Sequence, residues 1–87
     1  MSWTVKISNQ ARADLDHFRA YDRASYLNCY RLSVAVSKDP FFGPGKPMPI
    51  EGLNGNVWCR RTNISDRMVY ELFDNSITVA SYRTHLE

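Results

Sequence analysis

Four basic side chains in the C-terminal half of this 87-residue chain have spacings that suit one shared site. Arg61 and Arg67 flank a short turn segment, so a hairpin there would make the two arginines neighbours across the ladder. Arg83 and His85 are two residues apart, and alternate residues of a strand share a face. If the strand registers agree, all four side chains converge at one end of a sheet.

The chemistry that such a cluster suits is phosphate binding with proton transfer. The guanidinium fork of arginine matches phosphate oxygens bidentately, and imidazole titrates near neutral pH. Two opposed guanidiniums repel unless an anion or a carboxylate lies between them. The alternative is a solvated polar face, with Asp66 and Glu71 neutralising the arginines and His85 in a frayed tail.

Metal or disulfide chemistry is not expected. Cys29 and Cys59 form neither a CxxC motif nor a pair next to clustered histidines, so we expect two reduced thiols, no metal and no cofactor. The N-terminus lacks the apolar region of a signal peptide, and no apolar run approaches the ~18 residues of a membrane span. We therefore expect a cytoplasmic protein without a membrane partner, and the net charge of +2 permits an anionic partner.

The elements that must position these side chains are a strand, two helices and three further strands. Apolar and polar residues alternate over 3–7, as in a strand with one buried face. Ser8 and Asp22 are N-cap candidates for helices over 9–21 and 23–39, and Pro40 ends the second helix at Asp39. The apolar stripe expected on the second helix comprises Leu27, Tyr30 and Val34, with Tyr26, Cys29 and Ser33 beside it.

Beyond this helix the apolar period changes from 3.6 to 2. Segments 57–64, 67–73 and 76–85 are β-rich and separated by turns short enough for hairpins, which predicts an antiparallel meander. The order β-α-α-β-β-β predicts a single α+β domain over 1–87, with two helices on one face of a mainly antiparallel sheet.

One long segment separates the helices from the meander. Residues 39–56, "DPFFGPGKPMPIEGLNGN", contain all four glycines and all four prolines of the chain. Loops of this length are usually functional or disordered. Its glycines permit close backbone turns and its prolines limit the free conformations, so we expect an ordered edge of the phosphate site.

The run "GPGKPMPIEGLNGNVWCRRTNISDRMVYEL" resembles the G-x-GKPEPL…G-x-WSRRI…HRLVY signature of YoeB/Txe toxins in the RelE/ParE superfamily. The ending "RTHL" is similar to the R-x-H-Y ending of those toxins, and the resemblance covers essentially the whole chain. It implies a RelE-like fold and the toxin of a type II toxin–antitoxin pair.

The resemblance also implies an activity and partners. Such toxins enter the A site of the 30S ribosomal subunit and cut the messenger RNA there by metal-free attack of a ribose 2′-hydroxyl, which inhibits translation. DNA lacks this nucleophile, so RNA is the expected substrate. The expected partner is a YefM/Axe-like antitoxin whose disordered C-terminal segment covers the site, and a homodimer of the free toxin is compatible with the family.

Mapped onto this sequence, the resemblance assigns three catalytic residues. Arg67 matches the arginine that stabilises the transition state, Arg61 the supporting basic position, and His85 the catalytic histidine. The further residues expected to bind RNA or phosphate are Lys46, Arg60 and Arg83.

Two positions depart from the family pattern. The glutamate of GKPEP, the family's proposed general base, is Met48 here, and the terminal tyrosine is Leu86. Residues 86–87 read "LE", which also matches a cloning-site remnant. Glu51 is either a substitute for the carboxylate missing at Met48 or a solvated charge of the loop. The alternatives to an active nuclease are a weakened or non-enzymatic toxin that acts by binding the ribosome or gyrase, and a plain α+β binding module.

Overall fold

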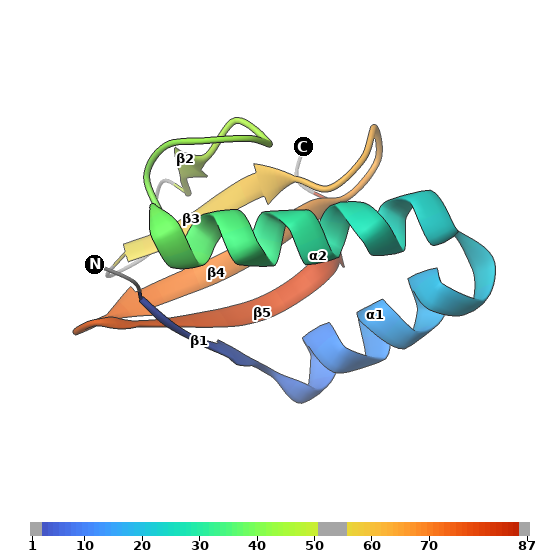
Figure 1. The fold of residues 1–87 in the computed structure, drawn as a ribbon, viewed down its shortest axis with the longest axis horizontal. Coiled ribbons are helices and arrows are strands. Elements are labelled where there is room, and N and C mark those ends of the chain that lie inside the picture. Colours follow the sequence, from blue (N-terminus) through green and yellow to red (C-terminus); the bar gives the residue numbers. More distant parts are fainter. Residues whose placement is uncertain (1–2, 51–55, 86–87) are drawn as a thin grey trace.

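The computed structural model describes residues 3–50 and 56–85 as two helices packed on one face of a five-stranded sheet (Figure 1). The elements are β1 (Thr4–Ile7), α1 (Asn9–Tyr21), α2 (Arg23–Lys38), β2 (Met48–Pro49), β3 (Asn56–Arg61), β4 (Arg67–Phe73) and β5 (Ser76–Thr84). The strand order is β1-β5-β4-β3-β2, with β1 parallel to β5 and the other pairs antiparallel. The predicted α+β class and meander are confirmed, and β2 is an addition inside the long loop.

Both helices begin at the predicted caps. The Ser8 hydroxyl accepts a hydrogen bond from the amide of Ala11 at 3.0 Å, and the Asp22 carboxylate accepts one from the amide of Ser25 at 3.1 Å. The hydroxyl of Ser25 also donates to Asp22, and this bond is the main cause of a lowered Asp22 pKa. Neither helix in the described part of the chain has the length and hydrophobicity that crossing a membrane requires.

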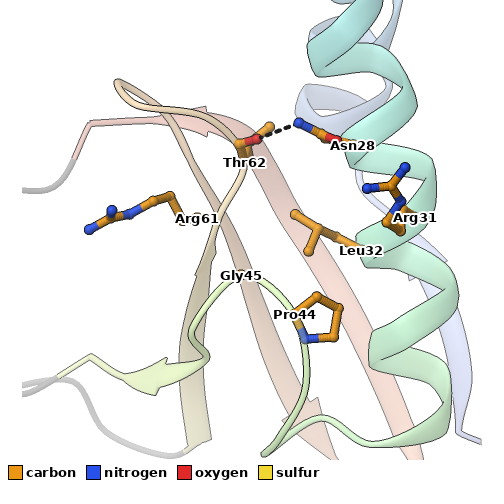
Figure 2. A pocket seen from close by; sticks show the side chains of 7 residues that line it. All are labelled: Asn28, Arg31, Leu32, Pro44, Gly45, Arg61 and Thr62. Atoms are coloured by element: carbon orange, nitrogen blue, oxygen red, sulfur yellow. Dashed lines mark hydrogen bonds between the residues drawn. The ribbon is translucent and has the colours of Figure 1, made fainter.

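The loop after α2 turns back against that helix before it reaches β2 (Figure 2). Gly45 has a φ of +85°, and a Cβ placed there would lie 2.9 Å from Cδ2 of Leu32 and 3.1 Å from Cβ of Arg60. Only glycine satisfies both the left-handed backbone and the close approach at this point. The loop is therefore packed onto the helix and the sheet, as expected for an ordered edge.

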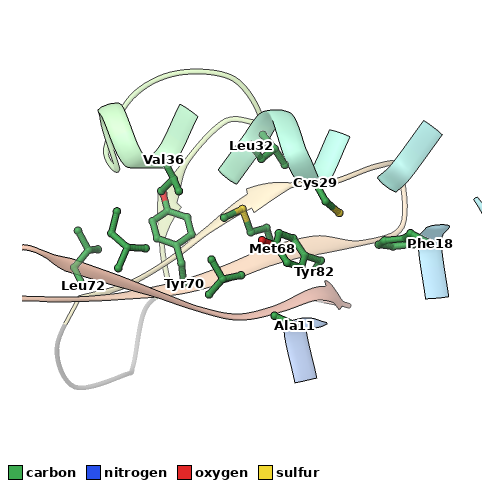
Figure 3. Close-up of a cluster of buried hydrophobic side chains, with 11 residues drawn as sticks. Ala11, Phe18, Cys29, Leu32, Val36, Met68, Tyr70, Leu72 and Tyr82 are labelled. Atoms are coloured by element: carbon green, nitrogen blue, oxygen red, sulfur yellow. The ribbon is translucent and has the colours of Figure 1, made fainter. Parts of the chain in front are cut away.

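The core lies between the helices and the inward face of β4 and β5 (Figure 3). Its buried side chains are Ala11, Phe18, Cys29, Leu32, Val36, Met68, Tyr70, Leu72, Ile77, Val79 and Tyr82. The predicted stripe of α2 is wrong, because Leu27, Tyr30 and Val34 are exposed. Two apolar stripes overlap on this helix, and packing against the sheet selects the one that carries Cys29, Leu32 and Val36.

A local irregularity in β5 connects the sheet to α1. The register passes from Tyr70–Val79 to Val69–Ser81, so an extra residue of β5 lies between the two pairs. The backbone amide of Tyr82 donates to the buried carboxylate of Asp14 at 2.9 Å instead of joining the ladder. This hydrogen bond joins α1 to β5 next to the irregularity.

Both cysteines are free and buried, as expected for reduced thiols, and burial raises the pKa of Cys29 to about 12. We predict that Ellman's reagent at about pH 8, near the pKa of an ordinary cysteine, modifies neither thiol in the native protein. In denaturant both should react, and the native modification rate should follow global unfolding. Prompt native reaction of one thiol would contradict the packing of that residue.

Candidate functional site

The candidate site lies on the sheet face that points away from the helices. Arg61 of β3 is directly opposite Arg67 of β4, as the hairpin spacing predicted. Opposed residues share a face, so Thr84, the partner of Arg67 in β5, lies on this face too. Met48 of β2 pairs with Cys59, which places Met48 on the same face as Arg61.

Arg61 and Arg67 are directly opposed on the ladder, and no carboxylate within the described residues forms an ion pair with either of them. Within 3–50 and 56–85 the ion pairs are Arg19 with Asp16 and His85 with Asp66. The solvated-face alternative requires Asp66 and Glu71 to neutralise the arginines. Within these residues neither carboxylate forms an ion pair with Arg61 or Arg67. Like charges directly opposed on a ladder repel, so an anion bound between them would stabilise the pair.

Met48 is in contact with Arg67 of this pair. Its side chain is 47% exposed, and its Sδ lies 3.8 Å from Nη1 of Arg67. A thioether sulfur is a weak hydrogen-bond acceptor and cannot take a proton near neutral pH. The position beside Arg67 thus holds a group with no acid–base function. Leu86 and Glu51 lie outside the described residues.

His85 lies at the same end of the sheet, next to the turn between β3 and β4. Its Nε2 is 3.4 Å from Oδ1 of Asp66, the residue before Arg67. The imidazole is 72% exposed at the side chain and so is open to a ligand. Within the described residues the recorded contact of His85 is with Asp66 and not with Arg61 or Arg67, so its convergence with the two arginines stays a prediction. The contact with Asp66 was not foreseen, since sequence spacing suggested that Asp66 would neutralise an arginine.

Arg83 does not join this group, contrary to expectation. The register changes between Val69–Ser81 and Arg67–Thr84, so Thr84 rather than Arg83 lies opposite Arg67. The guanidinium carbon of Arg83 lies 5.8 Å from the centroid of the Phe18 ring. Because Phe18 belongs to α1, Arg83 extends toward the helix side, where a cation–π contact replaces the predicted phosphate contact.

Arg60 is also not a phosphate ligand in this structure. It is fully buried on the helix face, and its guanidinium donates hydrogen bonds to protein oxygens only. Nε donates to the Tyr70 hydroxyl at 3.2 Å and Nη1 to the Pro44 carbonyl at 3.1 Å. Nη2 donates to the carbonyls of Phe42, at 3.1 Å, and Asp39. Arg60 therefore holds the loop from the helix face of the sheet and is not available to bind RNA on the outer face.

Tyr70 extends the contacts of Arg60 to the start of the loop. Its hydroxyl donates to the carbonyl of Pro40 at 2.5 Å. Burial raises the pKa of Tyr70, although the hydrogen bond from Arg60 opposes this shift. The phenol consequently stays protonated and keeps its donor role in the core.

The loop is further held by an aromatic contact and by the edge of β3. The Phe41 ring lies edge-on between those of Trp3 and Trp58, with centroid distances of 6.3 and 5.1 Å. The amide of Arg61 donates to the carbonyl of Gly45 at 2.6 Å. Lys46, exposed and next to Gly45, is thereby placed at the β3 edge, where it remains a candidate for phosphate binding.

A cavity of about 190 Å³ lies beside this edge, between the loop, β3 and α2. Its lining residues are Asn28, Arg31, Leu32, Pro44, Gly45, Arg61 and Thr62. In Figure 2 the guanidinium of Arg61 points away from α2 and out of the cavity. Sequence reasoning did not identify Arg31 as a residue near the site, because only the docking of the loop brings Arg31 and β3 to one cavity. No group of three or more histidine, cysteine or acidic residues in the described ranges is arranged to hold a metal ion.

Comparisons with known proteins agree with this fold. The sequence model for the YoeB-like toxin of bacterial type II toxin–antitoxin systems matches residues 7–86. The chain is 38% identical over 78 residues to Toxin YoeB of Escherichia coli K12, which covers 90% of this chain and 93% of that toxin.

Solved structures from Staphylococcus aureus are similar over nearly the whole chain. The YoeB dimer superposes with a TM-score of 0.86 at 28% identity, covering 99% of this chain and 100% of that one. The heterotetrameric YoeB–YefM complex gives a TM-score of 0.81 at 26% identity, covering 99% and 100%.

The separate roles of the two adjacent arginines give a stability prediction. Lysine has one nitrogen and cannot bind Tyr70 and three carbonyls at once, so Arg60→Lys should lower the free energy of unfolding by about 2–4 kcal/mol. The same change at its exposed neighbour, Arg61→Lys, should cost about 0.5 kcal/mol or less. Denaturant unfolding monitored by tryptophan fluorescence measures both. Equal losses at the two positions would refute the supporting role of Arg60.

Proposed function

Because the chain belongs to the YoeB-like toxin family of bacterial type II toxin–antitoxin systems, we propose that it is a ribosome-dependent endoribonuclease that cuts messenger RNA in the A site and inhibits translation. The observation that carries this proposal is the open pair of Arg61 and Arg67, with His85 at the same end of the sheet. This arrangement suits a phosphodiester that gains negative charge during reaction.

The proposed reaction uses the RNA's own nucleophile. The ribose 2′-oxygen forms a bond to the adjacent phosphorus while the bond from phosphorus to the 5′-oxygen breaks, giving a 2′,3′-cyclic phosphate and a 5′-hydroxyl end. Arg61 and Arg67 stabilise the extra negative charge on the phosphoryl oxygens in the transition state. His85, as an imidazolium ion, donates a proton to the departing 5′-oxygen. Lys46 binds a neighbouring backbone phosphate.

The proton of the 2′-hydroxyl has no carboxylate acceptor at the position of Met48 and passes to water. Loss of a general base typically costs about 10²–10⁴-fold in rate. The ribosome fixes the geometry of the bound message, and such positioning is worth several kcal/mol independently of the base. We therefore propose a weakened rather than an inactive nuclease, acting in the cytoplasm where ribosomes are.

We also propose a cognate antitoxin as the physiological partner, as in the S. aureus YoeB–YefM complex. A disordered segment that covers the site would place acidic side chains on Arg61 and Arg67 and apolar ones on Phe42, which is 74% exposed. The S. aureus YoeB dimer supports a homodimer for the free toxin.

The competing function is inhibition by binding alone, at the ribosome or at gyrase, and Met48 is the feature that favours it. A supercoiling assay with purified gyrase separates the two functions. Inhibition of gyrase without any cut in ribosome-bound RNA would replace the nuclease proposal with the binding one.

The nuclease proposal predicts cuts within the A-site codon of ribosome-bound message and slower cleavage by two variants. His85→Ala and Arg67→Ala should each lower the single-turnover rate by about 10²-fold or more, because each removes proton donation or charge stabilisation. Arg83→Ala is the matched control and should retain the rate within a few-fold, since Arg83 contacts Phe18 instead. Primer extension on stalled ribosomes measures the cuts.

Absence of cleavage by the unmodified protein, at any concentration and on ribosome-bound or free RNA, would contradict the proposal. A larger loss for Arg83→Ala than for Arg67→Ala would contradict the placement of the site on the outer sheet face.

A further inference from the structure

Asp66 lies where it can orient His85. The Oδ1 atom of Asp66 is 3.4 Å from Nε2 of His85, and this is the one ion pair of the histidine among the described residues. The Asp66 side chain is only 13% exposed, whereas that of His85 is 72% exposed. An open imidazole beyond the last strand thus contacts a carboxylate that is largely enclosed by the protein.

The carboxylate of Asp66 is itself held by the turn between β3 and β4. Its Oδ2 accepts a hydrogen bond from Nδ2 of Asn63 at 3.0 Å. The backbone amide of Asp66 donates to Oδ1 of Asn63 at 2.7 Å, and its carbonyl accepts from the amide of Thr62 at 2.9 Å. Both main-chain and side-chain atoms of Asp66 are therefore held by hydrogen bonds that do not involve His85.

Asn63 ties this turn to the junction of the two helices. Its Nδ2 also donates to the hydroxyl of Ser25 at 2.8 Å, and that hydroxyl donates to Asp22 at 2.7 Å. The turn is thus anchored to the N-terminal cap of α2. A hydrogen-bonded path runs from the cap through Asn63 to Asp66, and His85 is at its end.

We propose that Asp66 is a positioning residue for His85. The carboxylate faces Nε2, restricts rotation of the imidazole, and leaves Nδ1 as the ring nitrogen that meets the substrate. The inference rests on the proposed function, since it assigns Asp66 to the proton donation to the 5′-oxygen.

The roles of counter-ion and of orienter differ in which partner Asp66 contacts. A counter-ion would pair with Arg67, its chain neighbour, or with Arg61 across the ladder. Within the described residues Asp66 forms an ion pair with His85 and with neither arginine. Loss of the carboxylate should therefore impair proton donation and leave phosphate binding intact.

The test compares Asp66→Asn with His85→Ala and with the control Asp74→Asn. Asp74 lies in the exposed turn between β4 and β5 and has a φ of +56°, a conformation that asparagine adopts readily. On ribosome-bound message we expect Asp66→Asn to lower kcat by about 10–100-fold with KM unchanged, since a misplaced catalytic group costs about that much. Asp74→Asn should match the unmodified protein.

The decisive readout uses a message with a 5′-bridging sulfur at the A-site cleavage position. A thiolate leaves without being protonated, so His85→Ala and Asp66→Asn should both regain the rate of the unmodified protein on this substrate. A destabilised variant would not be rescued in this way. If Asp66→Asn proves too unstable to purify, Asp66→Glu, which keeps the charge and moves it, should show a smaller loss with the same rescue.

The outcomes distinguish a failure of the proposed function from a failure of the positioning role of Asp66. If His85→Ala cleaves the oxygen substrate at the full rate, the proposed function fails. If His85→Ala is slow and rescued by sulfur, but Asp66→Asn is either fully active or slow without rescue, the positioning role is overturned and the proposed function remains.

Discussion

The buried guanidinium of Arg60 is the interaction on which the geometry of the site depends. An arginine removed from water must satisfy its donors, and a buried charge without partners would cost several kcal/mol. Arg60 does so with the carbonyls of Asp39, Phe42 and Pro44 and the hydroxyl of Tyr70. The requirement acts in both directions: the loop carbonyls solvate the cation, and the cation holds a loop that has no helix or strand before β2.

The burial of Arg60 also determines, through the alternation of side chains along β3, which residues lie on the outer face of the sheet. Arg60 points inward, so Arg61 points outward, directly opposite Arg67. The carbonyl of Gly45 binds the amide of Arg61, and the chain then enters β2, where Met48 pairs with Cys59 and reaches Arg67. The two arginines of one dipeptide thus have different surroundings: Arg60 organises the loop, and Arg61 points to the outer face, where we propose that phosphate binds.

Much of this could be predicted from sequence because it depends on local rules. The caps at Ser8 and Asp22, the change of apolar period after the loop and the pairing of Arg61 with Arg67 all follow from neighbours in the chain. The burial of Arg60 could not be predicted, since the acceptors of its guanidinium come from a loop some twenty positions away. The same holds for Arg83 and for the α2 stripe, where a register irregularity and helix packing decide which side chain faces which surface.

The proposed site thus keeps its arginine pair, while Met48 stands beside Arg67 where the family's proposed general base would be. The most direct test is single-turnover cleavage of ribosome-bound message by Met48→Glu, with Met48→Gln as a control of similar size that cannot act as a base. Restoring a carboxylate next to Arg67 should raise the rate by about 10²–10⁴-fold over the unmodified protein, and glutamine should not. Equal rates for the glutamate and glutamine variants would contradict the proposed site.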